Sequence, residues 1–99
     1  MNPDGRMVVG TLRIRMVIRA ARSLKEKRRV VKSFKDRVRN KFNASVAEIG
    51  ALDTHQQAIL GVAVVGNDST YVHSVLSQIS NLAAADREAE LAACDVEIL

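Results

Sequence analysis

Apolar and polar positions alternate along residues 11–19. One set holds Leu12, Ile14, Met16 and Ile18, and the other holds Arg13, Arg15, Val17 and Arg19. Because successive side chains of a strand point to opposite faces, the alternation predicts a β-strand with one buried face and one open face. Residues 1–6 contain a Pro-Asp-Gly turn signal, which predicts a disordered or extended lead-in.

A helix is predicted over residues 24–42. Ser23 and Glu26 form a Ser-x-x-Glu capping box, in which the hydroxyl and the carboxylate accept hydrogen bonds from free N–H groups at a helix start. Apolar residues then recur at spacings of seven, three, four and four, at Leu24, Val31, Phe34, Val38 and Phe42. We expect this stripe to face the core.

From residue 45 onward the sequence predicts three strands and one helix. A short strand at residues 45–49 leads through a loop at 50–57 to a β-branched, apolar central strand at 58–65. Asn67 or Asp68 is expected to cap a helix over 69–84. The core face of that helix would hold Val72, Val75, Leu76, Ile79, Leu82 and Ala83. The alternation of Cys94, Val96 and Ile98 with Asp95 and Glu97 predicts a last strand, with Cys94 as a small core residue.

The order βαββαβ predicts an α+β fold, the ferredoxin-like sandwich, with a four-stranded antiparallel sheet and two helices on one face. Residues 7–99 would form this single domain. Right-handed crossovers place the first and third strands in the centre and the last strand beside the first. Arg13 and Arg15 would then share the open face with Asp95 and Glu97, as cross-strand ion pairs or as ligand-binding groups. Arg19, beyond the end of the partner strand, is expected to be freer to bind a ligand.

Composition narrows the class of protein. The 99 residues are 47% hydrophobic and 26% charged, which is typical of one compact domain. The single cysteine excludes an internal disulfide and suits a reducing cytoplasm. The longest apolar run, residues 58–65, is far shorter than a membrane span. We therefore expect a cytoplasmic protein without a membrane segment.

Charge is unevenly distributed. Residues 1–50 carry 14 Lys and Arg against four acids, a net charge of +10, whereas residues 51–99 carry one Arg against seven acids, a net charge of −6. This asymmetry indicates an interaction face for a polyanion or an acidic protein. Folding could also bring the two halves together and cancel much of the field.

The first helix carries a basic stripe on its expected solvent side. Together with two arginines at the entry of the helix, the candidate nucleic-acid-binding residues are Arg19, Arg22, Lys25, Arg28, Arg29, Lys32, Lys35 and Arg39. Like charges at helical spacings of three and four repel, and a polyanion would remove that repulsion. The alternative is a solvated face that keeps the protein soluble.

Other chemistry has little support. Phe34, Phe42 and Tyr71 fall on helices, so the sheet lacks aromatic rings for base stacking, and shape and phosphate contacts remain. His55 and His73 have no neighbours at metal-ligand spacing, and no nucleophile accompanies Asp53 and His55. We therefore expect no enzymatic activity, no metal and no cofactor.

The chain resembles the YlxP-like family, domain of unknown function 503. The resemblance rests on the segment from Arg22 to Asn43, on Ser45-Val-Ala-Glu, on Leu60-Gly-Val-Ala-Val-Val, on Asn67-Asp and on Asp95-Val-Glu-Ile. It departs from the family at Thr54-His55-Gln56-Gln57, where relatives often carry an aromatic residue. The resemblance implies a ferredoxin-like fold. In many bacteria these genes lie near those for translation initiation factor two and ribosome-binding factor A, which implies a role in ribosome maturation or translation.

Two functions follow as hypotheses. The first is a non-enzymatic accessory protein that binds structured RNA or a ribosomal particle through phosphate contacts of the basic helix. The second is a dimeric protein-interaction module whose ferredoxin-like domains pair through the sheet and whose basic stripe binds an acidic protein. The open sheet face and the strand edges make a homodimer possible under either hypothesis.

Overall fold

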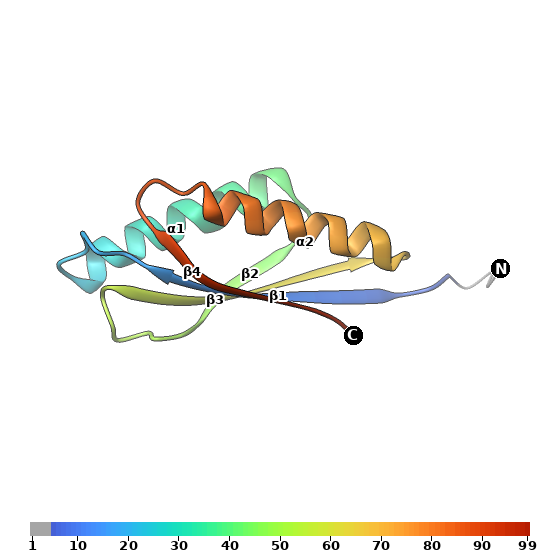
Figure 1. Ribbon diagram of the computed structural model, residues 1–99, viewed down its shortest axis with the longest axis horizontal. Coiled ribbons are helices and arrows are strands. Elements are labelled where there is room, and N and C mark those ends of the chain that lie inside the picture. The colour runs from blue at the N-terminus through green and yellow to red at the C-terminus, as the bar shows by residue number, and fades with distance from the viewer. Residues whose placement is uncertain (1–4) are drawn as a thin grey trace.

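The computed structural model describes residues 5–99 and confirms the ferredoxin-like βαββαβ sandwich. Its elements are β1 (Val8–Val17), α1 (Leu24–Lys41), β2 (Ser45–Gly50), β3 (Gln57–Gly66), α2 (Ser69–Ala84) and β4 (Glu90–Ile98). The strands are antiparallel in the order β2-β3-β1-β4, and both helices cover one face of the sheet (Figure 1). Most of the predicted lead-in, residues 1–4, lies outside the described residues.

The predicted alternation in β1 is confirmed. Leu12, Ile14, Met16 and Ile18 are buried, whereas Arg13 and Arg15 are exposed on the opposite face. The strand itself runs over Val8–Val17 and not over residues 11–19, so its predicted bounds were wrong. The strand starts earlier because Val8 already pairs with Gly66 of β3. At Gly10 an added Cβ would lie 2.5 Å from a methyl carbon of Val72, so glycine lets α2 pack directly onto this end of the strand.

The last strand is longer than predicted. β4 begins at Glu90 and pairs with β1 through an irregularity between Arg15 and Met16. Its first residues, Glu-Leu-Ala-Ala, favour helix by intrinsic propensity, and the pairing with β1 overrides that preference. Cys94 lies half-buried against the core, with its Sγ 3.2 Å from the Ser80 hydroxyl.

Both helices begin as predicted. Ser23 Oγ accepts a hydrogen bond from the Glu26 N–H at 3.1 Å, and the Glu26 carboxylate accepts one from Arg22 N–H, one residue before the cap. Asp68 caps α2 by accepting from the Tyr71 N–H at 3.1 Å. α1 ends at Lys41, with Phe42 as its C-cap.

The core face of α1 contains a charged residue that the sequence did not predict. Lys27 is fully buried, and its Nζ lies 2.8 Å from a carboxylate oxygen of Glu48 on β2. The same ammonium donates hydrogen bonds to the carbonyls of Ala51 at 2.9 Å and Leu52 at 3.4 Å. A buried ammonium requires such partners. Lys27 therefore fixes α1 to β2 and to the turn that follows β2.

Replacing Lys27 by methionine should lower the free energy of unfolding by about 3 kcal/mol, because Glu48 would keep its buried position without a counter-charge. The double variant Lys27→Met/Glu48→Leu should recover about 2 kcal/mol of this loss, since both charges are then removed. Urea denaturation of the wild type and both variants measures the difference. A Lys27→Met protein as stable as the wild type would contradict this role.

Candidate nucleic-acid interface on the basic helix

The outward face of α1 carries a straight row of cations. Lys25, Arg28, Lys32, Lys35 and Arg39 follow one another at offsets of three or four residues. Side chains at these offsets lie above one another on a helix, so the row extends over about 21 Å at 1.5 Å per residue. The apolar residues Phe34 and Val38 are fully buried on the side that faces the sheet. The core packing of α1 therefore leaves Lys25, Arg28, Lys32 and Arg39 exposed and Lys35 half-buried.

Arg19, expected to be free for a ligand, is paired. Its Nε lies 3.0 Å from Glu90 Oε2, with both side chains largely exposed. The expectation was wrong because β4 begins at Glu90, opposite Val17, and brings that carboxylate to the end of β1.

Two further arginines are held in the same way by the segment between α2 and β4. Arg29 lies 3.0 Å from Glu88, and Arg37 pairs with the buried carboxylate of Asp86. Asp86 also accepts hydrogen bonds from the backbone N–H groups of Glu88 and Ala89 at 2.8 and 3.0 Å, which orders the segment. Alternate residues Asp86, Glu88 and Glu90 thus each bind one arginine. Folding cancels part of the basic charge of the first half.

Two members of the row have partners close by. Lys32 forms an ion pair with Asp36 at 2.7 Å, and Arg39 donates a hydrogen bond to the Val46 carbonyl of β2 at 3.1 Å. The hydrogen bond from Lys32 lowers the pKa of Asp36 below its usual value of 3.8, and the charges of Lys32, Arg39 and Lys35 act in the same direction. Asp36 therefore remains ionised at neutral pH and offsets one charge of the row.

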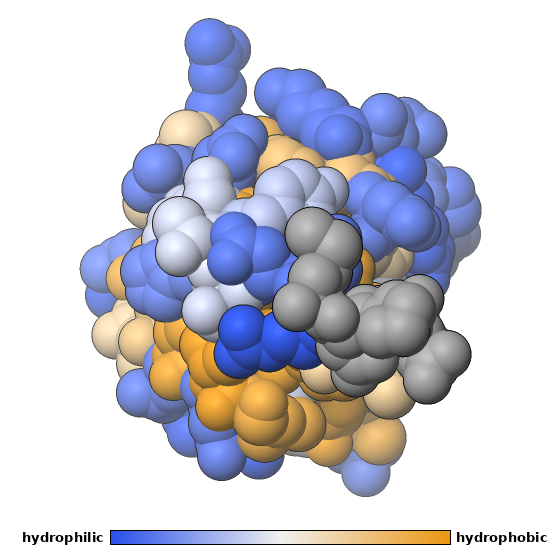
Figure 2. Space-filling model, turned by 90° about the vertical axis from the view of Figure 1, so that its right-hand side faces the viewer, coloured by the Kyte–Doolittle hydropathy of each residue, from blue (hydrophilic) through white to orange (hydrophobic). Residues whose placement is uncertain are grey.

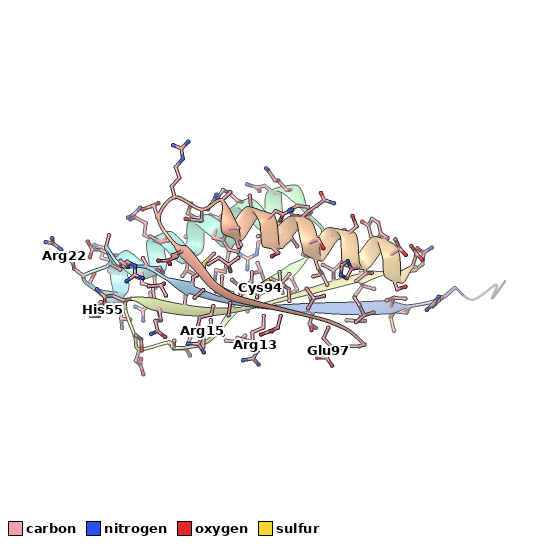
Figure 3. The ribbon with its side chains drawn as sticks, in the orientation of Figure 1. Arg13, Arg15, Arg22, His55, Cys94 and Glu97 are labelled. Atoms are coloured by element: carbon pink, nitrogen blue, oxygen red, sulfur yellow. The ribbon has the colours of Figure 1, made fainter. Side chains whose placement is uncertain are left out.

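Four of the eight predicted residues remain available. The side chains of Arg22, Lys25, Arg28 and Lys35 make no ion pair or hydrogen bond within residues 5–99. We call these four the open cations. Figure 3 shows Arg22 at the end of the molecule where β1 passes into α1, on the same side as His55. The open cations therefore continue the helical row onto the entry of α1.

Gln56 positions this entry, and sequence reasoning missed it. Its side-chain amide donates to the carbonyls of Arg19 at 3.2 Å and Ala21 at 3.4 Å. The backbone carbonyl of Gln56 accepts a hydrogen bond from the Ile18 N–H at 2.8 Å. The loop before β3 thereby supports the turn that carries Arg22. No local pattern marks a glutamine for such a role, because its partners are more than 30 residues away.

A cavity of about 720 Å³ lies between the entry of α1 and the segment before β4. Apolar side chains such as Ile18, Val30 and Leu91 contribute to its lining. The charged residues around it are Arg19, Arg29, Arg87, Glu26, Asp86, Glu88 and Glu90. Since four carboxylates face three arginines, this cavity has no excess of positive charge for an anion. None of the four open cations lines this cavity.

The open face of the sheet is not an RNA-stacking surface. Phe34 and Phe42 lie on the core side of α1, and Tyr71 lies on α2. Arg13 stands opposite Asp95 in the strand register without forming an ion pair, and Arg15 donates to Gln57 at 3.3 Å. The cross-strand ion pairs expected for the two arginines are therefore not formed in the described chain. In Figure 3 Arg13, Arg15 and Glu97 lie below the sheet, away from the helices.

Residues 5–99 contain neither a cluster of metal-binding side chains nor a helix that could cross a membrane. No group of three or more His, Cys, Asp or Glu side chains lies close enough together to hold a metal ion. No helix among these residues has the length and hydrophobicity to cross a membrane.

The strand order and the placement of both helices on one face define a small α+β ferredoxin-like domain that exposes a basic helix. The chain belongs to the family described as "Protein of unknown function (DUF503)", whose model matches residues 9–96. The uncharacterized protein YlxP of Bacillus subtilis (strain 168) is 39% identical over 72 residues, which cover 73% of this chain and 78% of the relative. The family resemblance seen in the sequence is confirmed.

Solved structures support the fold. The de novo designed protein Foldit4 matches with a TM-score of 0.55 and 20% identity, over 95% of this chain and 97% of the design. A C-terminal segment of the alpha subunit of aIF2 from Pyrococcus abyssi matches with a TM-score of 0.54 and 12% identity, over 95% of this chain and 50% of that one. At these identities the likeness shows the fold alone.

The Lys32 hydrogen bond predicts a measurable titration. In the folded protein the pKa of Asp36 should lie below 3.8, and the substitution Lys32→Gln should raise it toward that value. Because the folded pKa is lowered, the stabilising effect of the pair is present above the unfolded pKa and is lost as the pH falls through the folded one. NMR titration of the Asp36 carboxyl carbon measures both values. An unchanged pKa in Lys32→Gln would show that the ion pair is not formed in solution.

Proposed function

We propose that this protein is a non-enzymatic accessory factor that binds structured RNA, as free RNA or within a ribosomal particle, through phosphate contacts of α1. The observation that carries the proposal is the row on the outward face of α1, in which Lys25, Arg28 and Lys35 have no partner within residues 5–99 while the neighbouring cations are paired. An unpaired cation can release condensed counterions from a phosphate backbone without first losing an internal partner. The gene neighbourhood of the resembled family is consistent with this role.

The type of contact follows from which groups are exposed. The aromatic side chains belong to the helices, and the open sheet face carries carboxylates beside its arginines. Base stacking and base-edge reading therefore have no platform on the sheet. A row of lysines and arginines on a helix would contact the phosphate backbone of RNA and recognise the shape of the RNA, with little sequence preference. We accordingly propose structured RNA as the partner in place of a defined single-stranded sequence.

The open cations and the paired cations should contribute unequally. Arg22, Lys25, Arg28 and Lys35 would contact phosphates at once, whereas Arg19 and Arg29 would first have to leave Glu90 and Glu88. Exposed ion pairs of this kind contribute only about 0–1 kcal/mol each, so phosphates can displace them. Lys32 and Arg39 would contribute in the same secondary way.

Reversing three open cations should abolish most of the RNA affinity. In the variant Lys25→Glu/Arg28→Glu/Lys35→Glu, the slope of log K against log salt should become shallower by about 2 to 3, because three fewer counterions are released. Fluorescence anisotropy with a labelled RNA hairpin at several salt concentrations measures the slope. Circular dichroism should show an unchanged fold, since Lys25 and Arg28 are exposed, Lys35 is half-buried and none of the three belongs to the buried core.

A matched control separates the effect of the row's position from the effect of net charge. The variant Arg6→Glu/Lys41→Glu/Arg87→Glu makes the same change in net charge at exposed positions outside the row. It should retain most of the affinity and a steep salt slope. Equal losses in the two triple variants would show that only the overall charge matters and would reject α1 as the interface.

Releasing the paired arginines should strengthen binding. In the variant Glu88→Gln/Glu90→Gln, Arg29 and Arg19 lose their carboxylate partners and become available to phosphates. We expect an increase in RNA affinity on the order of two- to tenfold, the range that two exposed ion pairs can contribute. The control Asp53→Asn/Glu97→Gln removes the same charge elsewhere and should gain less. If both double variants gain equally, Arg19 and Arg29 are not part of the interface.

A further inference from the structure

The face of the sheet opposite the helices has a hollow with small residues at its floor. The hollow measures about 630 Å³, and Thr11, Ala47, Gly61 and Ala63 lie within it. Ile49 stands beside it over Gly61, where an added Cβ would lie 3.2 Å from the Ile49 side chain. The middle of this face is therefore recessed, and larger apolar side chains such as Ile49 border it.

Exposed apolar residues continue at one end of the same face. Val65 is 59% exposed and pairs with Val9, whose carbonyl accepts a hydrogen bond from the N–H of Leu99, itself 71% exposed. Figure 2, which looks at the end of the molecule nearest the N-terminus, shows apolar surface gathered on the lower side, below the helices. Contiguous exposed apolar surface of this kind marks an interaction site.

The charges of this face balance. β1 contributes Arg13 and Arg15, and β4 contributes Asp95 and Glu97. A polyanion would meet two carboxylates there, so this face does not suit RNA. A surface that carries both signs around an apolar hollow can instead complement a rotated copy of itself.

The strand edges are less suited to a second copy. On β4, Asp95 and Glu97 would face the same acids of a copy paired edge to edge. β2 is only six residues long, and its Val46 carbonyl already accepts a hydrogen bond from the Arg39 side chain. The open face therefore offers the better surface for a second copy.

We propose that a second copy of this chain packs on the open face, related by a twofold axis that runs parallel to the strands between β1 and β3. This rotation exchanges β1 with β3, so the strand register places Arg13 across from Gly61 and Thr11 across from Ala63. Long side chains thereby meet small ones. An axis perpendicular to the strands would instead stack β4 on β4 and bring like charges together.

The same rotation exchanges β4 with β2. Glu97 and Asp95, which stand in register with Thr11 and Arg13, come to lie over Ser45 and Ala47 of the copy. Ala47 is therefore the small residue that faces acidic side chains of the second copy. Within its own chain, Ala47 is separated from Asp95 by β3 and β1.

The size of the face predicts a weak dimer. Four strands about 4.8 Å apart, averaging about nine residues at about 3.3 Å each, give on the order of 600 Å² per copy. This is less than the roughly 800 Å² of a standard interface, so we expect association in the micromolar range. The two α1 rows would lie on opposite outer faces of the dimer. The dimer does not depend on RNA binding, and the two proposals fail separately.

Sedimentation equilibrium of the full chain tests the proposal. The average mass should rise from 10.8 kDa toward twice that value as the concentration increases from about 1 to 500 μM. Ala47→Glu should weaken association at least tenfold, because the new carboxylate meets Asp95 of the copy. Ala47→Arg, which adds similar bulk, should associate more strongly than Ala47→Glu, because its charge is opposite. Circular dichroism melting should show both variants folded, since Ala47 is exposed.

The variants Asn81→Glu and Asn81→Arg make the same charge changes on exposed α2 and should associate as the wild type does. A wild-type mass of 10.8 kDa throughout the concentration range would overturn the dimer. Equal weakening by Ala47→Glu and Ala47→Arg, or no weakening by either, would overturn the proposed arrangement.

Discussion

The buried ammonium of Lys27 sets the position of α1 on the sheet. It has three oxygen partners, from the Glu48 carboxylate and from the carbonyls of Ala51 and Leu52. An ammonium removed from water is stable only where such partners surround it, so α1 has little freedom to rotate or slide on β2. The rotation of α1 decides which side chains face solvent. The outward direction of the basic row therefore depends on this ion pair together with the core packing of Phe34 and Val38.

The fold divides the basic charge into a neutralised part and an available part. The segment before β4 places Asp86, Glu88 and Glu90 against Arg37, Arg29 and Arg19, and these pairs join the two oppositely charged halves of the sequence. The side chains of the open cations form no ion pair within the described chain. An interface of this design has a small set of cations ready for phosphate, flanked by others that exposed carboxylates hold weakly. The acids near the row would then set the strength of RNA binding and limit non-specific attraction.

Elements with a clear period were predictable from the sequence, whereas long-range pairings were not. The alternation of β1 and the apolar face of α2 gave the fold, because each pattern fits one secondary structure. The position of Lys27 has a sequence signal, because it falls three residues after Leu24, inside the gap of seven before Val31 on the core stripe. The partners of Arg19 and Arg29 lie 71 and 59 residues away, and only the packing of β4 brings them close. The start of β4 was also not predictable, because its first residues favour helix and pairing with β1 determines that they form a strand.

The proposed function requires the basic row of α1 to attach this protein to structured RNA through phosphates. Sucrose-gradient fractionation of a native cell extract, followed by detection of the protein in each fraction, measures this attachment. The protein should travel with ribosomal particles or their precursors at low salt, and move to the top of the gradient as salt rises or after nuclease treatment. A protein that stays at the top of the gradient at low salt, or whose attachment to particles is insensitive to salt, would rule out attachment through phosphates.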